Sequence, residues 1–85
     1  MKELKHIIKY ESGIHARPAG LLVKTLSEFS GEVRVGTPKK MVDGKRVFAV
    51  MSLGLKQSEE MTLTFDGPDE DAAAARVKSF LIANL

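Results

Sequence analysis

Alternating apolar and polar residues predict four β-strands in this chain, because a period of two places every second side chain on one face of a sheet. The predicted strands are residues 4–10, 32–35, 40–43 and 60–66. The last is the clearest, with Met61, Leu63 and Phe65 on one side. Residues 36–39 are turn-forming and join the second and third strands into a predicted hairpin.

A helical period follows the first predicted strand. Apolar residues recur three or four positions apart on one face, namely Pro18, Leu22, Leu26 and Phe29. This spacing predicts a helix from Arg17 to Phe29, with Gly31 as its stop because glycine adopts the left-handed conformation without a Cβ penalty. Lys24 and Glu28 lie four residues apart and predict a solvated ion pair on another side of the helix.

Residues 47–54 form a compact apolar run whose pattern fits either a buried strand or a short helix. Gly54 favours the helix, because glycine commonly ends one. Two turns of helix cannot bury every apolar side chain of this run on one face. Val47, Phe48 and Met51 therefore either belong to the core or form a small exposed patch suited to docking another protein.

The chain ends in a third predicted helix, whose stripe consists of Ala73, Val77, Phe80, Leu81 and Asn84. Asp69, Glu70 and Asp71 precede it, where the helix dipole favours negative charge. Four half-apolar strands need one covered face, and three helices suffice to cover it. The predicted fold is therefore α+β, a four-stranded antiparallel sheet with helices on one face, in the order β-α-β-β-α-β-α.

Composition indicates an ordinary globular protein. The 85 residues are 44% hydrophobic and 28% charged, which fits one domain spanning residues 1–85. The net charge of +2 is too small to indicate nucleic-acid binding, and Trp is absent. Neither a signal peptide nor a membrane-spanning run is seen, and without cysteine no disulfide forms. We expect a cytoplasmic protein without membrane insertion.

His6 and the acidic residues 69–71 are of types that bind metals, but each has a simpler explanation. His6 shares a face with Leu4 in the first predicted strand, and no second ligand lies at a useful spacing. We expect a partly buried strand histidine. The acidic residues at 69–71 are explained by stabilisation of the helix start. No metal site and no cofactor are expected.

The stretch Gly13–Gly20 combines a glycine turn, a histidine, an arginine and a proline. Pro18 predicts that a helix begins at about Ala16 or Arg17, with His15 just outside it. The first N–H groups of a helix lack internal partners and attract anions, and the Arg17 guanidinium suits phosphate oxygens. His15 is then a nucleophile at a site that could hold a phosphoryl group. The alternative is a surface or capping histidine, as single histidines near helix starts commonly are.

Three motifs resemble the histidine-containing phosphocarrier (HPr) family of the phosphoenolpyruvate-dependent sugar phosphotransferase system. They are residues 12–19 (SGIHARPA), residues 50–54 (VMSLG) and residues 66–67 (DG), in the family's order and spacing. The resemblance spans nearly the whole chain and implies the open-faced β-sandwich of that family. It also implies a phosphoryl carrier rather than an enzyme.

The resemblance further implies that Nδ1 of His15 accepts a phosphoryl group from phosphorylated enzyme I and passes it to an enzyme IIA domain. Arg17 would neutralise the phosphate, and the backbone N–H groups of Ala16 and Arg17 would bind its oxygens. The residues implied at the partner-docking face are Gly20, Lys24, Val47, Phe48 and Met51. We add Arg46 to this face as a hypothesis of our own. The carrier is expected to be a monomer.

Arg46 departs from the family, since many relatives carry at this place a serine that an ATP-dependent kinase phosphorylates. Arginine has no hydroxyl, so that modification cannot occur here, and it cannot cap the following helix. We interpret Lys45 and Arg46 either as a basic rim that steers acidic partners or as ordinary solvated side chains. The alternative function is a regulatory HPr-like docking module, in nitrogen or carbon control, with little transport flux.

Overall fold

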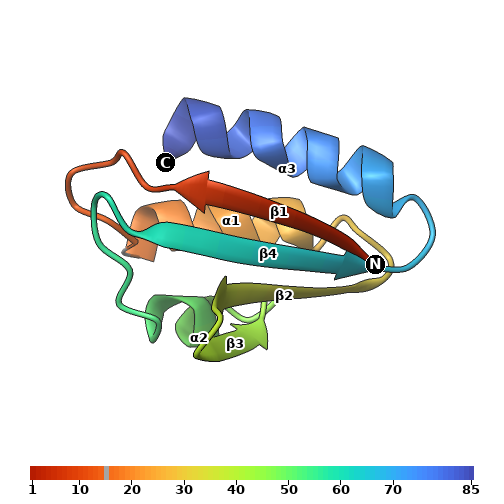
Figure 1. Ribbon diagram of the computed structural model, residues 1–85, viewed down its shortest axis with the longest axis horizontal. Helices are drawn as coiled ribbons and strands as arrows, with labels where there is room; N and C mark the ends of the chain where they lie inside the picture. Colours follow the sequence, from red (N-terminus) through yellow and green to blue (C-terminus); the bar gives the residue numbers. More distant parts are fainter. Residues whose placement is uncertain (15) are drawn as a thin grey trace.

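The computed structural model describes residues 1–14 and 16–85 and confirms the predicted order of elements (Figure 1). The elements are β1 (Lys2–Ile7), α1 (Ala16–Leu26), β2 (Glu32–Thr37), β3 (Lys40–Asp43), α2 (Val47–Met51), β4 (Glu60–Asp66) and α3 (Glu70–Asn84). The first strand ends earlier than its alternating pattern suggested, and the second extends through Thr37. The final strand has the predicted bounds.

The strands form one antiparallel sheet in the order β1-β4-β2-β3. Leu63 of β4 lies opposite Leu4 on one side and Val35 on the other, so alternate side chains of three strands meet on a common face. Met61, Leu63 and Phe65 are fully buried on that face. The described helices pack against it, and α1 crosses behind the strands in Figure 1. The predicted α+β fold is confirmed.

The first helix ends at Leu26, three residues before the predicted end at Phe29. The N–H groups of Glu28 and Phe29 donate to the carbonyls of Thr25 and Leu26, so the chain leaves the helix through tighter turns. Glu28 is therefore not held opposite Lys24, and the predicted pair between them is wrong. Its carboxylate instead accepts from Arg76 of α3 at 3.3 Å.

Gly31 does not stop the helix in a left-handed conformation, and its prediction as a stop is wrong. A Cβ at this position would collide with the carbonyl oxygen of Asp66 and would lie 2.8 Å from the Phe29 ring. Phe29 packs edge-on against Phe65, with ring centroids 5.8 Å apart. Gly31 is thus needed for close approach of the chain to the end of β4.

Two of the acidic residues at the start of α3 make ion pairs with the start of the chain. Glu70 accepts from the Gly67 N–H at 3.3 Å and pairs with the Met1 amino group at 3.0 Å. The hydrogen bond and charge of that amino group hold the pKa of Glu70 below its usual range. Asp71 pairs with Lys2 at 3.5 Å.

The far end of α3 departs from the predicted stripe. Val77 and Leu81 are buried, and Ala73 and Phe80 pack partly against the core, but Asn84 is exposed. Ala74 takes part in the buried face instead. His6 is half-buried on β1 as expected, and within the described structure its Nε2 is buried without a hydrogen-bond partner. Among residues 1–14 and 16–85, no helix is both long and apolar enough to cross a bilayer.

Candidate functional site

The loop before α1 is held in place by its glycine. Gly13 has a φ of +66°, and a Cβ there would lie 2.5 Å from the carbonyl oxygen of Leu55 and 2.9 Å from the Cα of Lys56. The N–H of the buried Ile14 donates to the same Leu55 carbonyl at 2.9 Å. These contacts fasten the chain to the segment after α2, immediately before His15. His15, the predicted phosphoryl acceptor, lies outside the described residues.

The helix begins at Ala16, as predicted. Pro18 is buried in its first turn, where the missing N–H leaves no hydrogen bond unmade. Ala16 and Arg17 are exposed, so their backbone N–H groups belong to the open, positive end of the helix dipole. Within the described chain the Arg17 guanidinium makes no hydrogen bond or ion pair. Its donors are thus available to an anion at the helix start.

A second exposed feature lies on the neighbouring helix α2, which packs against α1. The Phe48 side chain is 81% exposed, an extreme value for a large aromatic residue. Val47 and Met51 are half-buried and pack against the core, whereas Val50 is fully buried. Both interpretations of this apolar run therefore hold in part, and Phe48 provides most of the exposed surface.

The predicted docking residues of α1 lie further along the same helix. Gly20 is half-buried, and nothing lies within 4 Å of where its Cβ would be. Lys24 is exposed in the last turn. Leu21, which the sequence reasoning did not single out, is 44% exposed one turn after Arg17. Leu21 lies outside the apolar face of the helix, and this position in the sequence pattern could have indicated an exposed leucine.

The two cations before α2 differ in their surroundings. Lys45 is half-buried and its Nζ donates to the Phe29 carbonyl at 2.6 Å, so its predicted place on a basic rim is wrong. This bond ties the approach to α2 to the segment after α1. Arg46 is exposed and occupies the N-cap position of α2 without a side-chain capping bond, as predicted.

Comparison with known proteins gives consistent matches over the whole chain. Residues 2–83 match the PTS-HPr family, described as the PTS HPr component phosphorylation site. The chain is 38% identical over 86 residues to the phosphocarrier protein HPr of Mycoplasma genitalium, covering 99% of this chain and 97% of that protein.

Solved structures of HPr proteins are similar to this chain over nearly its whole length. The crystal structure of HPr-C-His from Thermoanaerobacter tengcongensis superposes with a TM-score of 0.91 at 37% identity, covering 99% of this chain and 94% of the other. An HPr dimer from the same organism gives a TM-score of 0.70 at 40% identity, covering 98% and 94% of the two chains. The class is therefore that of phosphocarrier proteins of the phosphotransferase system. The chain belongs to the PTS-HPr family.

Proposed function

We propose that this chain accepts a phosphoryl group on His15 from phosphorylated enzyme I and delivers it to enzyme IIA domains in sugar uptake. The observation that carries the proposal is the exposed start of α1, where Arg17 has no partner within the described residues and follows His15 by two positions. Membership of a family described by its phosphorylation site supports the same residue as acceptor.

The proposed transfer needs little chemistry from the protein beyond positioning and charge stabilisation. Nδ1 of His15 forms a bond to phosphorus, and the bond from phosphorus to the donor breaks with its electron pair leaving on the donor. Arg17 neutralises charge on the phosphoryl oxygens, and the N–H groups of Ala16 and Arg17 donate to them. Transfer to enzyme IIA repeats these steps with His15 as the leaving group.

The proposed docking surface consists of Gly20, Leu21, Lys24, Arg46, Val47, Phe48 and Met51. Phe48 supplies an exposed aromatic anchor of the kind that dominates binding energy at interfaces. Lys24 and Arg46 are exposed and make no ion pair within the described chain. This surface fits a partner with an apolar pocket rimmed by carboxylates.

Arg46 contributes to this surface through long-range attraction. Changing Arg46 to Glu is expected to slow phosphorylation by enzyme I, and more so at low salt, because a rim charge acts mainly on the association rate. Unchanged kinetics at low salt would rule out steering by this residue. We further propose that the carrier works in the cytoplasm as a monomer, although a relative is known as a dimer.

The test is to incubate the protein with phosphoenolpyruvate and enzyme I and then add an enzyme IIA domain. We expect an acid-labile, base-stable phosphate on the carrier that disappears when enzyme IIA is added. His15→Ala should abolish the label. His6→Gln is the matched control, because it removes the other histidine of the chain and should leave labelling unchanged. A wild-type protein that takes no label would contradict the proposal.

A further inference from the structure

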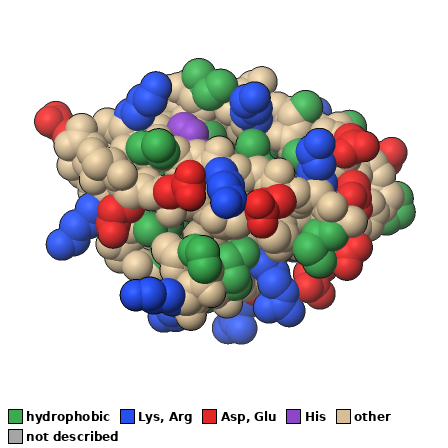
Figure 2. Space-filling view, in the orientation of Figure 1, with side chains coloured by type: hydrophobic (Ala, Val, Ile, Leu, Met, Phe, Trp, Pro, Cys, Tyr) green, Lys and Arg blue, Asp and Glu red, His purple; other side chains and the backbone are tan. Residues whose placement is uncertain are grey.

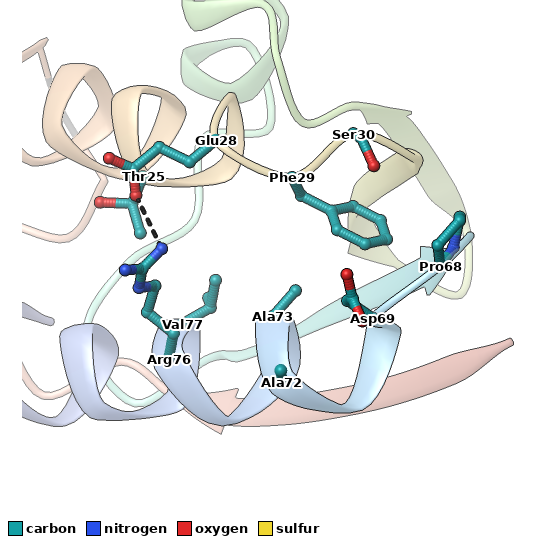
Figure 3. Close-up of a pocket in the computed structure, with 10 residues that line it drawn as sticks. All are labelled: Thr25, Glu28, Phe29, Ser30, Pro68, Asp69, Ala72, Ala73, Arg76 and Val77. Atoms are coloured by element: carbon teal, nitrogen blue, oxygen red, sulfur yellow. Dashed lines mark hydrogen bonds and ion pairs between the residues drawn. The ribbon is translucent and has the colours of Figure 1, made fainter.

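A groove with a volume of about 460 Å³ lies between the segment that follows α1 and the first turns of α3 (Figure 3). Its apolar lining includes Phe29, Ala73 and Val77. The groove is near the end of α1 at Leu26, whereas the proposed phosphoryl site is at its start. It is therefore separate from the phosphocarrier site.

The charged groups of this groove lie at its two ends (Figure 3). At one end Arg76 pairs with Glu28 at 3.3 Å, and both side chains are largely exposed, 70% and 56%. Such an exposed pair contributes little energy and opens easily. At the other end the Asp69 side chain points from the start of α3 toward the groove. The groove thus carries two carboxylates and one guanidinium.

Asp69 is free to interact with a ligand. It has a φ of +61° and occupies the N-cap position of α3, yet its carboxylate makes no capping bond. Within the described residues it has no ion pair or hydrogen bond through its side chain. An aspartate at the N-cap position usually accepts a hydrogen bond from the helix N–H groups, and Asp69 does not. Its negative charge is directed to the groove instead.

The surroundings strengthen the negative potential of this end of the molecule. Asp66 lies three residues before Asp69 and has no ion pair within the described residues. The neighbouring carboxylates of Glu70, Asp71 and Glu32 are each paired with a cation, namely the Met1 amino group, Lys2 and Arg34, and contribute less. Figure 2 shows acidic side chains gathered where β4 ends and α3 begins. The whole chain carries a net charge of +2, so this acidic end is opposite in sign to the rest. A concave site in such a field concentrates cations.

We propose that the groove binds a small organic cation, an ammonium or guanidinium group carried on an apolar stem. The cationic group pairs with Asp69, and the stem packs against Phe29, Ala73 and Val77. The two carboxylates outnumber the single guanidinium, so an anion of the same shape is disfavoured. The volume of about 460 Å³ lies within the range of small-ligand sites.

The experiment records amide NMR shifts while benzylamine, benzyl alcohol and benzoate are titrated separately into the full chain. Benzylamine should shift amides of the groove, whereas benzyl alcohol should bind more weakly and benzoate should leave these amides unmoved. Nα-acetyl-lysine amide, added in a further titration, represents the side chain of a protein partner. If Nα-acetyl-lysine amide binds more tightly than benzylamine, the natural ligand is a lysine side chain of a protein partner. If benzylamine binds more tightly, the natural ligand is a free amine.

Three variants test the electrostatic basis of binding. Asp69→Asn should weaken benzylamine binding roughly three- to fivefold, the size expected for one exposed charge pair, and asparagine tolerates the same backbone conformation. Arg76→Gln should tighten binding by a similar factor, because it removes the positive charge and frees Glu28. Asp71→Asn is the matched control, since Asp71 lies on the same helix outside the groove and pairs with Lys2. Equal binding of benzoate, or unchanged affinity in Asp69→Asn, would overturn the proposal.

Discussion

Replacing Gly20 with alanine should stabilise this protein. Gly20 is the fifth residue of the 11-residue helix α1, and its φ lies outside the left-handed region that requires glycine. Its Cβ would meet nothing within 4 Å. The substitution therefore introduces no clash and no strain, and it reduces the conformational freedom that the unfolded chain loses on folding.

The size of the gain follows from the helical position. Glycine in a helix interior is less favourable than alanine by roughly 0.5–1 kcal/mol. For a domain of this length, 1 kcal/mol corresponds to roughly 4–8 °C in Tm. We expect Gly20→Ala to raise the free energy of unfolding by about 0.5–1 kcal/mol and the Tm by about 2–8 °C.

Urea and thermal unfolding followed by circular dichroism measure this change directly. The matched control is Gly13→Ala, in which the new methyl group lies 2.5 Å from the Leu55 carbonyl oxygen and the backbone has a φ of +66°. This control should lose about 1–3 kcal/mol. A midpoint that stays constant or falls in Gly20→Ala, with an unchanged urea slope, would refute the reasoning about open space at Gly20.

Three further predictions concern other parts of the chain. Arg46→Ser should stabilise the protein by about 1 kcal/mol in urea unfolding, because serine caps α2 where arginine makes no capping bond; no gain would show that the cap position is filled another way. Phe48→Ala should raise the KM for enzyme I while leaving the free energy of unfolding nearly constant, because the ring is 81% exposed; a large loss of stability would contradict the exposed position. Glu70→Gln should lower stability at neutral pH, because the folded-state pKa of Glu70 is depressed by the amino group of Met1. Its stabilising effect is complete above the ordinary carboxyl range, about pH 4–5, and disappears as the pH falls further, so unfolding curves of the wild type and variant should converge in acid.

Residue periodicity was sufficient to predict the fold class and the order of elements along the chain, but it did not predict the strand order β1-β4-β2-β3. The alternation in residues 60–66 and the helical spacing of Leu22 and Leu26 identified the core strand and the first helix, because burial on one face determines both patterns. The start of α1 at Ala16 was also predictable, since Pro18 is compatible only with a first turn.

Tertiary contacts determined what the local pattern could not. Glu28 pairs with Arg76, 48 residues away, rather than with Lys24, because α1 ends before Glu28. Lys45 looked like a surface cation, yet its ammonium group donates to the Phe29 carbonyl. Leu21 was not predicted as a docking residue, because the helical pattern identifies the buried face and Leu21 lies outside that face.

The central claim, that His15 carries the phosphoryl group, is tested most directly by proton–nitrogen NMR of the two imidazoles during phosphorylation. Phosphoenolpyruvate and a catalytic amount of enzyme I are added to the protein, and His15→Ala assigns the resonances. We predict that Nδ1 of His15 shifts and acquires coupling to phosphorus, while the imidazole of His6 does not. Phosphorus coupling at His6, or its absence from both histidines of a protein that has taken up phosphate, would contradict the account.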